Sequence, residues 1–320
     1  MGIARTLAKV SLCYWWPGLK KSVIAYVSSC SHCQYNKPLS GRPVGKLMSI
    51  PPSKEPFETL GADHLGPFKL TARGNLHVFV LIDYLTKWLM AIPVPDLTTE
   101  SVIRALREHV IPQNGMMKRI ITDKGSAFTA HLLALELNRL GVRHVLATTE
   151  RPQANGLVEW SNRTLVYAVK GFINVKQNDW DEHLPAATLC INTAKQSSTR
   201  YSPFELVHGR PARLPHQSAF SWPATPSVSP REFHRRVLKW RTIARRLIEE
   251  SQRKSKLLYD QRHRHARRFE KGELVLVARN IRIVGRTKKL LPKFIGPFQI
   301  VQPRCDNTYL VEDVPAFRRR

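Results

Sequence analysis

The sequence predicts an α/β domain that is followed by a basic helix and a small β-barrel. Stretches with the period of strands alternate with stretches with the period of helices between residues 56 and 173, which is typical of an α/β fold. Near the C-terminus, alternating apolar residues and Gly-Pro turns recur at short intervals, which predicts a barrel. The 320 residues contain 51 Lys and Arg against 24 Asp and Glu, and this net charge of +27 indicates a polyanionic partner.

The first elements of the α/β domain are predicted to be strands. The stretch PFETLGADHLGPF ends at Gly66 and Pro67 like a strand running into a turn, so Asp63 is placed on that strand. The β-branched and aromatic run from Val78 to Ile82 and the run from Trp88 to Val94 follow it. These two runs predict a β-hairpin or meander.

A helix, a strand, a second helix and another strand are expected next. Thr98 or Thr99 caps the helix SVIRALREHVI, whose apolar positions share one face. The short strand RIITD then delivers Asp123 at its carboxyl end, where ligand sites form in open α/β sheets. HLLALELNRLG is helical with Gly141 as its stop, and VRHVLAT is another strand.

A long helix is expected to carry both polar and core residues. The turn ERPQANG opens the helix LVEWSNRTLVYAVKGFI, and Glu159 lies in its first turns. Three polar neighbours at helical spacing give one face groups suited to metal and phosphate: Asn155, Asn162 and Arg163. Three apolar residues can serve the core: Leu165, Val166 and Val169.

Three acidic residues on these elements are the candidate catalytic and metal-binding residues. Asp63, Asp123 and Glu159 are separated by 59 and then 35 residues. Phosphodiester chemistry often requires two divalent cations about 3.5 to 4 Å apart, so carboxylates must converge from distinct elements. Carboxylate oxygens are the ligands that hard cations prefer. The alternative is that each acid is a solvated strand-end or helix-surface residue.

Three motifs in order carry a resemblance to a known family. GADHLGPF, TDKGSAF and RPQANGLVEWSNRTL resemble the catalytic core of retroviral and long-terminal-repeat retrotransposon integrases, particularly the Ty3/gypsy group. The resemblance implies an RNase H-like fold with Asp63, Asp123 and Glu159 as the catalytic triad holding two Mg²⁺ or Mn²⁺ ions. It also implies trimming of the 3′ ends of a linear element DNA and joining of those ends to target DNA.

The chain departs from the family pattern beside the catalytic motifs. Glu150 and Arg151 stand where the family has His or Tyr and then His, Trp160 stands in place of Arg, and Ala127 in place of an acid. Because such side chains position DNA, an alternative is a catalytically impaired or domesticated integrase that acts as a DNA- or chromatin-binding protein. A third possibility is an RNase H-like nuclease that cleaves without joining.

Residues 1–40 resemble a truncated form of the family's zinc-binding segment. Cys30 and Cys33 form a C-x2-C pair after an apolar helical stretch, and this pair supplies half of a tetrahedral zinc site. The resemblance places two further His ligands upstream, but no histidine precedes Cys30, and His32 is a poor substitute. We therefore expect an upstream truncation and an incomplete site that binds Zn²⁺ weakly or not at all.

The predicted organisation continues to the C-terminus. The core domain spans 50–210, a Pro/Ser-rich linker spans 211–230, and a basic amphipathic helix spans 231–268. Residues 269–315 resemble the GPY/F-type, SH3-like module of this group, with Gly-Pro-Phe as its signature and Lys288, Lys289 and Lys293 as DNA contacts. Residues 231–320 hold 25 Lys and Arg against nine Asp and Glu, a net charge of +16.

The remaining features concern the compartment and the partners. Besides the Cys30 and Cys33 pair, Cys13, Cys190 and Cys305 are scattered, and five cysteines without a secretory signal predict a reducing intracellular compartment. The sequence has no apolar run of about 18 residues, so no membrane span is expected. The partners implied by the resemblance are element ends, target DNA and chromatin, bound by a homo-oligomer in the nucleus. Affinity for DNA should fall steeply with salt, by about 0.9 log units per log unit of salt for each phosphate neutralised.

Overall fold

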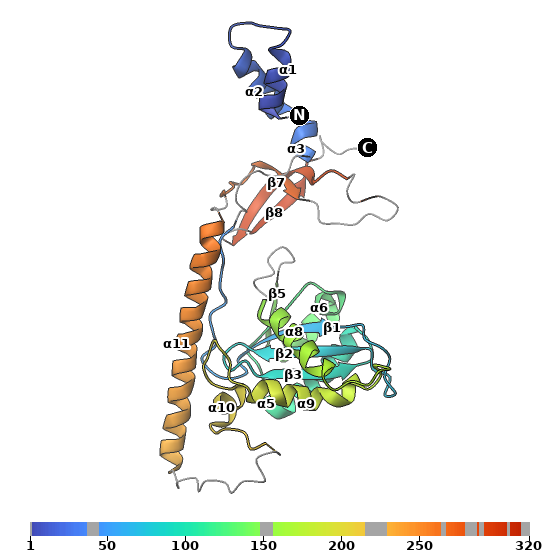
Figure 1. Cartoon of the computed structure of the whole chain (residues 1–320), viewed down its shortest axis with the longest axis vertical. Coiled ribbons are helices and arrows are strands. Elements are labelled where there is room, and N and C mark those ends of the chain that lie inside the picture. The colour runs from blue at the N-terminus through green and yellow to red at the C-terminus, as the bar shows by residue number, and fades with distance from the viewer. Residues whose placement is uncertain are drawn as a thin grey trace. The chain divides into compact units, whose positions relative to one another are not determined.

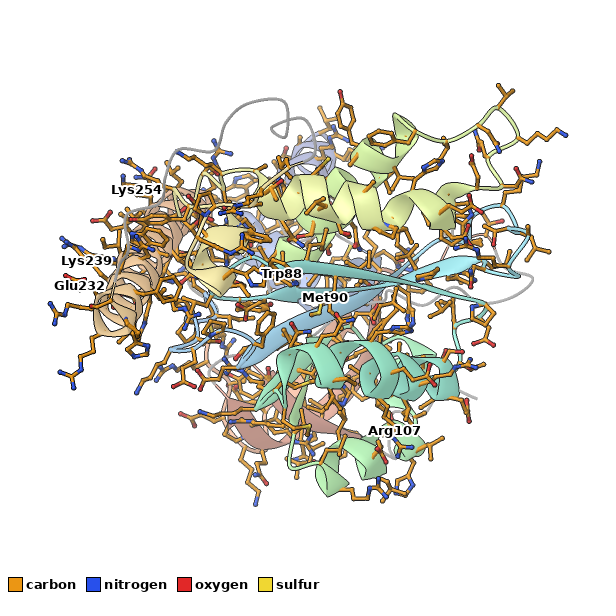
Figure 2. The ribbon with its side chains drawn as sticks, turned by 90° about the horizontal axis from the view of Figure 1, so that it is seen from below. Trp88, Met90, Arg107, Glu232, Lys239 and Lys254 are labelled. Carbon is orange, nitrogen blue, oxygen red and sulfur yellow. The ribbon has the colours of Figure 1, made fainter. Side chains whose placement is uncertain are left out.

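The computed structural model describes residues 2–36, 45–147, 156–214, 229–263, 267–278, 287, 291–305 and 308–314. The chain divides into two compact units (Figure 1). One unit is Leu47–Tyr259, and the other combines Met1–Lys46 with Asp260–Arg320. The predicted fold class is confirmed in the first unit, which contains a mixed sheet with helices on both faces (Figure 2).

The sheet of the first unit has five strands in the order β3-β2-β1-β4-β5. Strands β1, β2 and β3 form the expected antiparallel meander, whereas β4 and β5 continue the sheet in parallel from β1. The strands are β1 (Thr59–Leu65), β2 (His77–Asp83), β3 (Leu89–Val94), β4 (Arg119–Thr122) and β5 (Arg143–Leu146). Strand β1 is therefore central, with one antiparallel and one parallel neighbour.

Two layers of helices cover the sheet. One cluster of buried side chains joins the sheet to α4 (Thr99–Ala105), η1 (Leu106–Val110) and α7 (His131–Arg139). A second cluster joins it to α8 (Gly156–Lys170) and α9 (Trp180–Thr193). Strand β2 feeds both clusters, because Phe79 and Leu81 belong to the first while Val78, Val80 and Ile82 belong to the second. This alternation follows from the two-residue period of a strand.

The helix predicted over residues 101–111 is interrupted by one wider turn. Thr98 caps it by accepting a hydrogen bond from the Ser101 backbone, as expected, but the π-helical turn η1 precedes a short α5 (Ile111–Asn114). Pro112 lies just beyond the wide turn, has no backbone N–H and would crowd the preceding turn of a regular helix. The proline accounts for the change of helix type.

The basic helix α11 (Pro230–Arg262) is present, and it begins one residue before and ends six residues before the expected range of 231–268. It buries Val237, Ala244 and Ile248 on one side. Its Arg241 donates hydrogen bonds to the carbonyl oxygens of Leu206 (2.9 Å) and Val207 (3.1 Å) at the end of α10 (Pro203–His208). On the outer side, Figure 2 shows Glu232, Lys239 and Lys254 along the helix.

The second unit contains three helices and a small sheet in the part that the structure describes. Helix α1 (Ile3–Val10) packs on α2 (Leu19–Ser29) through Leu19, Val23 and Val27. Strands β6 (Leu274–Ala278), β7 (Phe294–Cys305) and β8 (Thr308–Asp313) form an antiparallel sheet in the order β6-β7-β8. From α3 (Ser31–Asn36), the Tyr35 hydroxyl donates to the Gly296 carbonyl at 2.6 Å. No helix among the described residues is long and apolar enough to cross a membrane.

We predict that Gly61→Ala destabilises the first unit by about 1 to 3 kcal/mol, because overpacking a core forces neighbours to shift. A Cβ atom at residue 61 of β1 would lie 2.6 Å from Val158 Cγ2 and 3.0 Å from Tyr84 Cε2. Gly171→Ala is the matched control, since its Cβ would meet only the Ala168 carbonyl oxygen at 3.6 Å. Chemical denaturation measures both variants, and equal free energies of unfolding would contradict the close packing.

Candidate active site

Strand register brings Asp63 and Asp123 to the same end of the sheet. The parallel pairing of β1 with β4 aligns Gly61 with Ile121, and two further residues along each chain reach Asp63 and Asp123. Two residues is also the period after which side chains return to the same face. Asp63 lies on β1 and Asp123 follows β4 directly, as the sequence predicts.

Helix α8 brings Glu159 to the same region. The helix begins at Gly156, so Glu159 lies in its first turn, as expected. Val158 is fully buried against β1 at the position where Gly61 has no side chain. Further along the helix, Asn162 is 8% exposed and its Nδ2 donates to Asp63 Oδ2 at 2.9 Å. One helix therefore supplies an acid to the site and an amide that orients another acid.

The charges of Asp123 and Glu159 both act on Asp63. Burial, together with the negative charges of Asp123 and Glu159, raises the pKa of Asp63 to about 6. Hydrogen bonds from the His64 backbone N–H, at 2.8 Å to Oδ1, and from Asn162 oppose this shift. The charged form of a half-buried carboxylate close to two other carboxylates is stabilised when a cation binds.

Asp123 is held by the turn that follows β4. The Gly125 backbone N–H donates to Asp123 Oδ1 at 2.9 Å. A Cβ atom at residue 125 would lie 3.1 Å from that oxygen, so a small residue suits the turn. The preceding residue, Thr122, is buried and its hydroxyl lies 2.8 Å from His144 Nε2. These bonds fix the carboxyl end of β4 and, with it, the direction of Asp123.

The donor atoms of this region fit a divalent cation. Carboxylate and amide oxygens are hard ligands, and the buried Asn162 Oδ1 makes no hydrogen bond within the described residues. The described part of the chain contains no group of three His, Cys, Asp or Glu side chains gathered closely enough to hold an ion. The three acids thus interact through their charges without forming a closed ligand shell.

His64 is a site residue that the sequence analysis did not single out. Its ring stacks on Phe128 with centroids 4.7 Å apart, and Nε2 is buried without a hydrogen bond in the described structure. Burial lowers the pKa of His64 to about 4, so the ring is neutral at neutral pH. The sequence offered one signal for this placement. His64 follows Asp63 on a strand, and adjacent strand residues face opposite sides of the sheet. His64 packs behind the carboxylate that it follows.

Only some of the residues expected to contact DNA lie within the part of the chain that the structure describes. Asn155, Lys288 and Lys289 lie outside the described residues, as do the departures at Glu150 and Arg151. Arg163 and Lys293 are exposed. The Asn162 side chain is turned towards Asp63, so its role towards DNA stays a prediction.

The two other departures from the family pattern lie within the described residues. Trp160 is 42% exposed beside Glu159, and Ala127 is buried in the core. An exposed indole and a buried methyl therefore stand where the family has a basic and an acidic side chain.

The two cysteines of the predicted zinc site lie at the junction of two helices. Cys30 follows α2 directly and Cys33 belongs to α3, and both are half-buried thiols. Within the described residues they join no group of three metal-ligating side chains. Weak or absent zinc binding stays a prediction.

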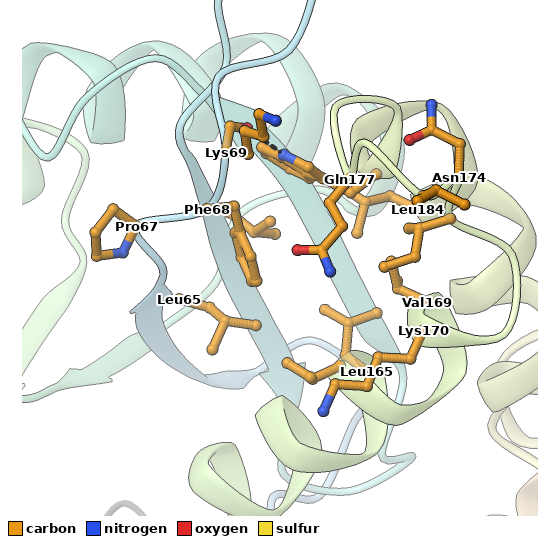
Figure 3. A pocket seen from close by; sticks show the side chains of 15 residues that line it. Leu65, Pro67, Phe68, Lys69, Leu165, Val169, Lys170, Asn174, Gln177 and Leu184 are labelled. Carbon is orange, nitrogen blue, oxygen red and sulfur yellow. Dashed lines mark hydrogen bonds between the residues drawn. The ribbon is translucent and has the colours of Figure 1, made fainter.

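A separate cavity of about 600 Å³ lies between the end of β1, α8 and α9 (Figure 3). Its walls are mostly apolar, with Leu65, Phe68 and Leu165 facing the space and Lys69 and Lys170 at the edges. None of the three acids lines it. The cavity is distinct from the carboxylate site.

Comparisons with known proteins agree with this architecture. Residues 1–39 match the family described as "Integrase zinc binding domain", and residues 53–152 match "Integrase core domain". The Transposon Tf2-3 and Tf2-4 polyproteins of Schizosaccharomyces pombe (strain 972 / ATCC 24843) are each 28% identical over 298 residues. That alignment covers 92% of this chain but 22% of each polyprotein, so the chain spans about a fifth of the length of these relatives.

A solved structure shows the same fold. It is titled "CryoEM structure of simian T-cell lymphotropic virus intasome in complex with PP2A regulatory subunit B56 gamma", and its chain matches with a TM-score of 0.52. The match covers 98% of this chain and 96% of that chain at 18% sequence identity. At this identity the likeness establishes the fold.

We predict that Asp63→Asn stabilises the metal-free protein at pH 7.5 and that the gain disappears on acidification. The native pKa of about 6 exceeds the ordinary value of 3.8, so the native state binds more protons between these values. Stability of the unmodified chain therefore falls as the pH rises through this window. The gain at pH 7.5 should be on the order of 1 kcal/mol, since solvent screens a partly exposed group.

Denaturation in a chelator at pH 7.5 and pH 4 measures this effect. Asp96→Asn is the control of opposite sign, because hydrogen bonds from Ser101 and Thr98 lower the pKa of Asp96. Its loss should destabilise the protein at pH 7.5. If Asp63→Asn were destabilising there as well, the electrostatic interpretation of the site would be wrong.

Proposed function

We propose that this chain, which belongs to the integrase family, trims the 3′ ends of a linear element DNA and joins them to target DNA by phosphoryl transfer. The observation that carries the proposal is that the β1–β4 register brings Asp63 and Asp123 to one end of the sheet while α8 carries Glu159 in its first turn. Burial and the charges of Asp123 and Glu159 raise the pKa of Asp63 there. The three carboxylates come from β1, the end of β4 and α8, and those of Asp123 and Glu159 act on Asp63 through their charges. Such a group has no structural benefit without a cation, because like charges repel.

Asp63, Asp123 and Glu159 would together hold two divalent cations, Mg²⁺ or Mn²⁺. When bound, these ions would supply a lowered pKa at the attacking oxygen and charge stabilisation at the leaving oxygen. The chain's own part is to keep the carboxylates oriented before the substrate arrives. Hydrogen bonds to Asp63 from Asn162 and to Asp123 from the Gly125 backbone serve that purpose.

The proposed substrate and partners follow from charge. A net charge of +27 favours element ends, target DNA and chromatin as partners, and two DNA ends favour a homo-oligomer. Integration into chromatin would take place in the nucleus. The exposed basic side chains of α11 are available for phosphates, because its buried side is apolar.

One observation favours a second candidate function, which is DNA or chromatin binding with impaired catalysis. Trp160 follows Glu159 directly and is 42% exposed, where the family pattern has an arginine. A missing guanidinium removes a phosphate contact beside a catalytic acid, whereas an indole can stack on a base. DNA affinity would then survive without joining.

A DNA-joining assay with Mg²⁺ or Mn²⁺ tests the proposal. We expect the unmodified chain to join a labelled element end to target DNA, and Asp123→Asn or Glu159→Gln to lower the rate on the order of 100-fold or more. The matched control is Glu108→Gln, since Glu108 is exposed on η1 away from the three acids. DNA affinity is measured in parallel at fixed salt.

The outcomes separate the candidate functions. Joining that depends on Asp123 and Glu159 supports the proposed transferase. DNA binding without joining by any variant would favour the second candidate, and cleavage without joining would favour a nuclease. Joining that persists in Asp123→Asn would place the chemistry elsewhere.

A further inference from the structure

A second cavity lies in the first unit between five segments of chain. Its volume is about 380 Å³, which lies within the usual size range of small-ligand sites of roughly 300 to 1,000 Å³. The walls come from residues 47–50, the β2–β3 turn, the start of α8, Ser198 and α11. None of Asp63, Asp123 and Glu159 lines it.

The β2–β3 turn contributes a buried lysine to this cavity. Lys87 is only 7% exposed. The net charge of the chain does not require this burial, because most of its 51 Lys and Arg could supply that charge from the surface. Its Nζ donates to the Tyr84 carbonyl at 2.8 Å, which uses one of the three donors of an ammonium. No carboxylate lies within salt-bridge distance of Nζ in the described structure.

The nearby Asp83 does not satisfy the remaining donors. Its Oδ1 accepts from the Phe57 backbone at 3.1 Å, and its Oδ2 accepts from the backbone and hydroxyl of Thr86 at 2.8 and 2.7 Å. These bonds organise the turn itself. Burial lowers the pKa of Lys87 to about 8. The negative charge of Asp83 opposes this shift from a distance by favouring the protonated lysine.

The backbone conformation of Lys87 is a second energetically unfavourable feature. Its φ angle is +66°, in the left-handed region that glycine adopts most easily. A lysine occupies a position that favours glycine, and its side chain is buried there. Both costs are understandable if the ammonium is needed at the cavity wall.

Hydroxyl groups face the same cavity from other segments. Ser198, Ser251 and Ser255 line it, and none of these three hydroxyls makes a hydrogen bond within the described residues. An ammonium with unused donors together with several hydroxyl donors is the chemistry that recognises a phosphate group. Apolar residues such as Leu157 and Ile248 complete the walls and would exclude water around it.

We infer that the cavity bounded by Lys87, the serines of α11 and Ser198 is a phosphate-binding site separate from the three acids. The phosphate could belong to a free nucleotide or to a strand of DNA, because the recognising groups are the same. No covalent step is involved. The site would bind phosphate whether or not the chain joins DNA.

Binding of inorganic phosphate to the full chain tests this inference, with chloride at equal ionic strength as the reference. We expect a saturable phosphate-dependent rise in melting temperature that Lys87→Gly abolishes, with phosphate affinity at least about tenfold weaker. Glycine suits the backbone angle, so this variant should fold. Lys239→Gln is the matched control, because Lys239 is exposed on the outer side of α11 (Figure 2).

A second variant and a competition experiment complete the test. Ser255→Leu keeps Lys87 but fills the cavity from α11, and it should also lose the phosphate effect. Displacement of phosphate by duplex DNA would identify a DNA phosphate as the ligand, and displacement by a nucleoside monophosphate alone would identify a free nucleotide. An equal phosphate response in the unmodified chain, Lys87→Gly and Ser255→Leu would overturn the inference.

Discussion

The approach of α8 to the central strand depends on the missing side chain at residue 61. Gly61 lies between Ile82 and Ile121 in the sheet, and Val158 fills the space that a Cβ atom would occupy. With the helix this close, Asn162 reaches Asp63 and Glu159 influences its charge. If α8 moved outward by the width of a methyl group, the hydrogen bond and the electrostatic coupling would both weaken. A packing contact thus sets the chemistry of the site.

This arrangement has an electrostatic cost that the rest of the domain must offset. Burial and two neighbouring carboxylates make the charged form of Asp63 unfavourable, and only two hydrogen bonds oppose this. The apolar clusters on both faces of the sheet supply the opposing stability, since buried apolar area is the main favourable term in folding. A cation would reverse the sign of the interaction among the acids. The site is therefore better suited to binding a cation than to stabilising the fold.

The sequence was sufficient for elements whose pattern is local. Strand period placed Asp63 on β1 and Asp123 at the end of β4, and the helical period placed Glu159 at the start of α8. Directions set by tertiary packing were not accessible in the same way. The turn of Asn162 towards Asp63 depends on how α8 crosses the sheet, and the burial of Lys87 depends on α11, more than 140 residues away in the chain. The π-helical turn at η1 could have been expected from Pro112, whose missing N–H was visible in the sequence.

The β2–β3 turn connects the site to the basic helix. The Tyr84 backbone donates to the Thr59 carbonyl of β1 at 3.1 Å, and its ring lies against Gly61. Three residues later, Lys87 lines the cavity to which α11 also contributes. At the same cavity, Gln252 of α11 donates to the Ile50 carbonyl at 2.8 Å. Arg241 fixes the same helix to the end of α10 through two carbonyl oxygens. Because these contacts are directional hydrogen bonds, they hold α11 at one register on the domain, and its basic side chains keep a defined position relative to the three acids.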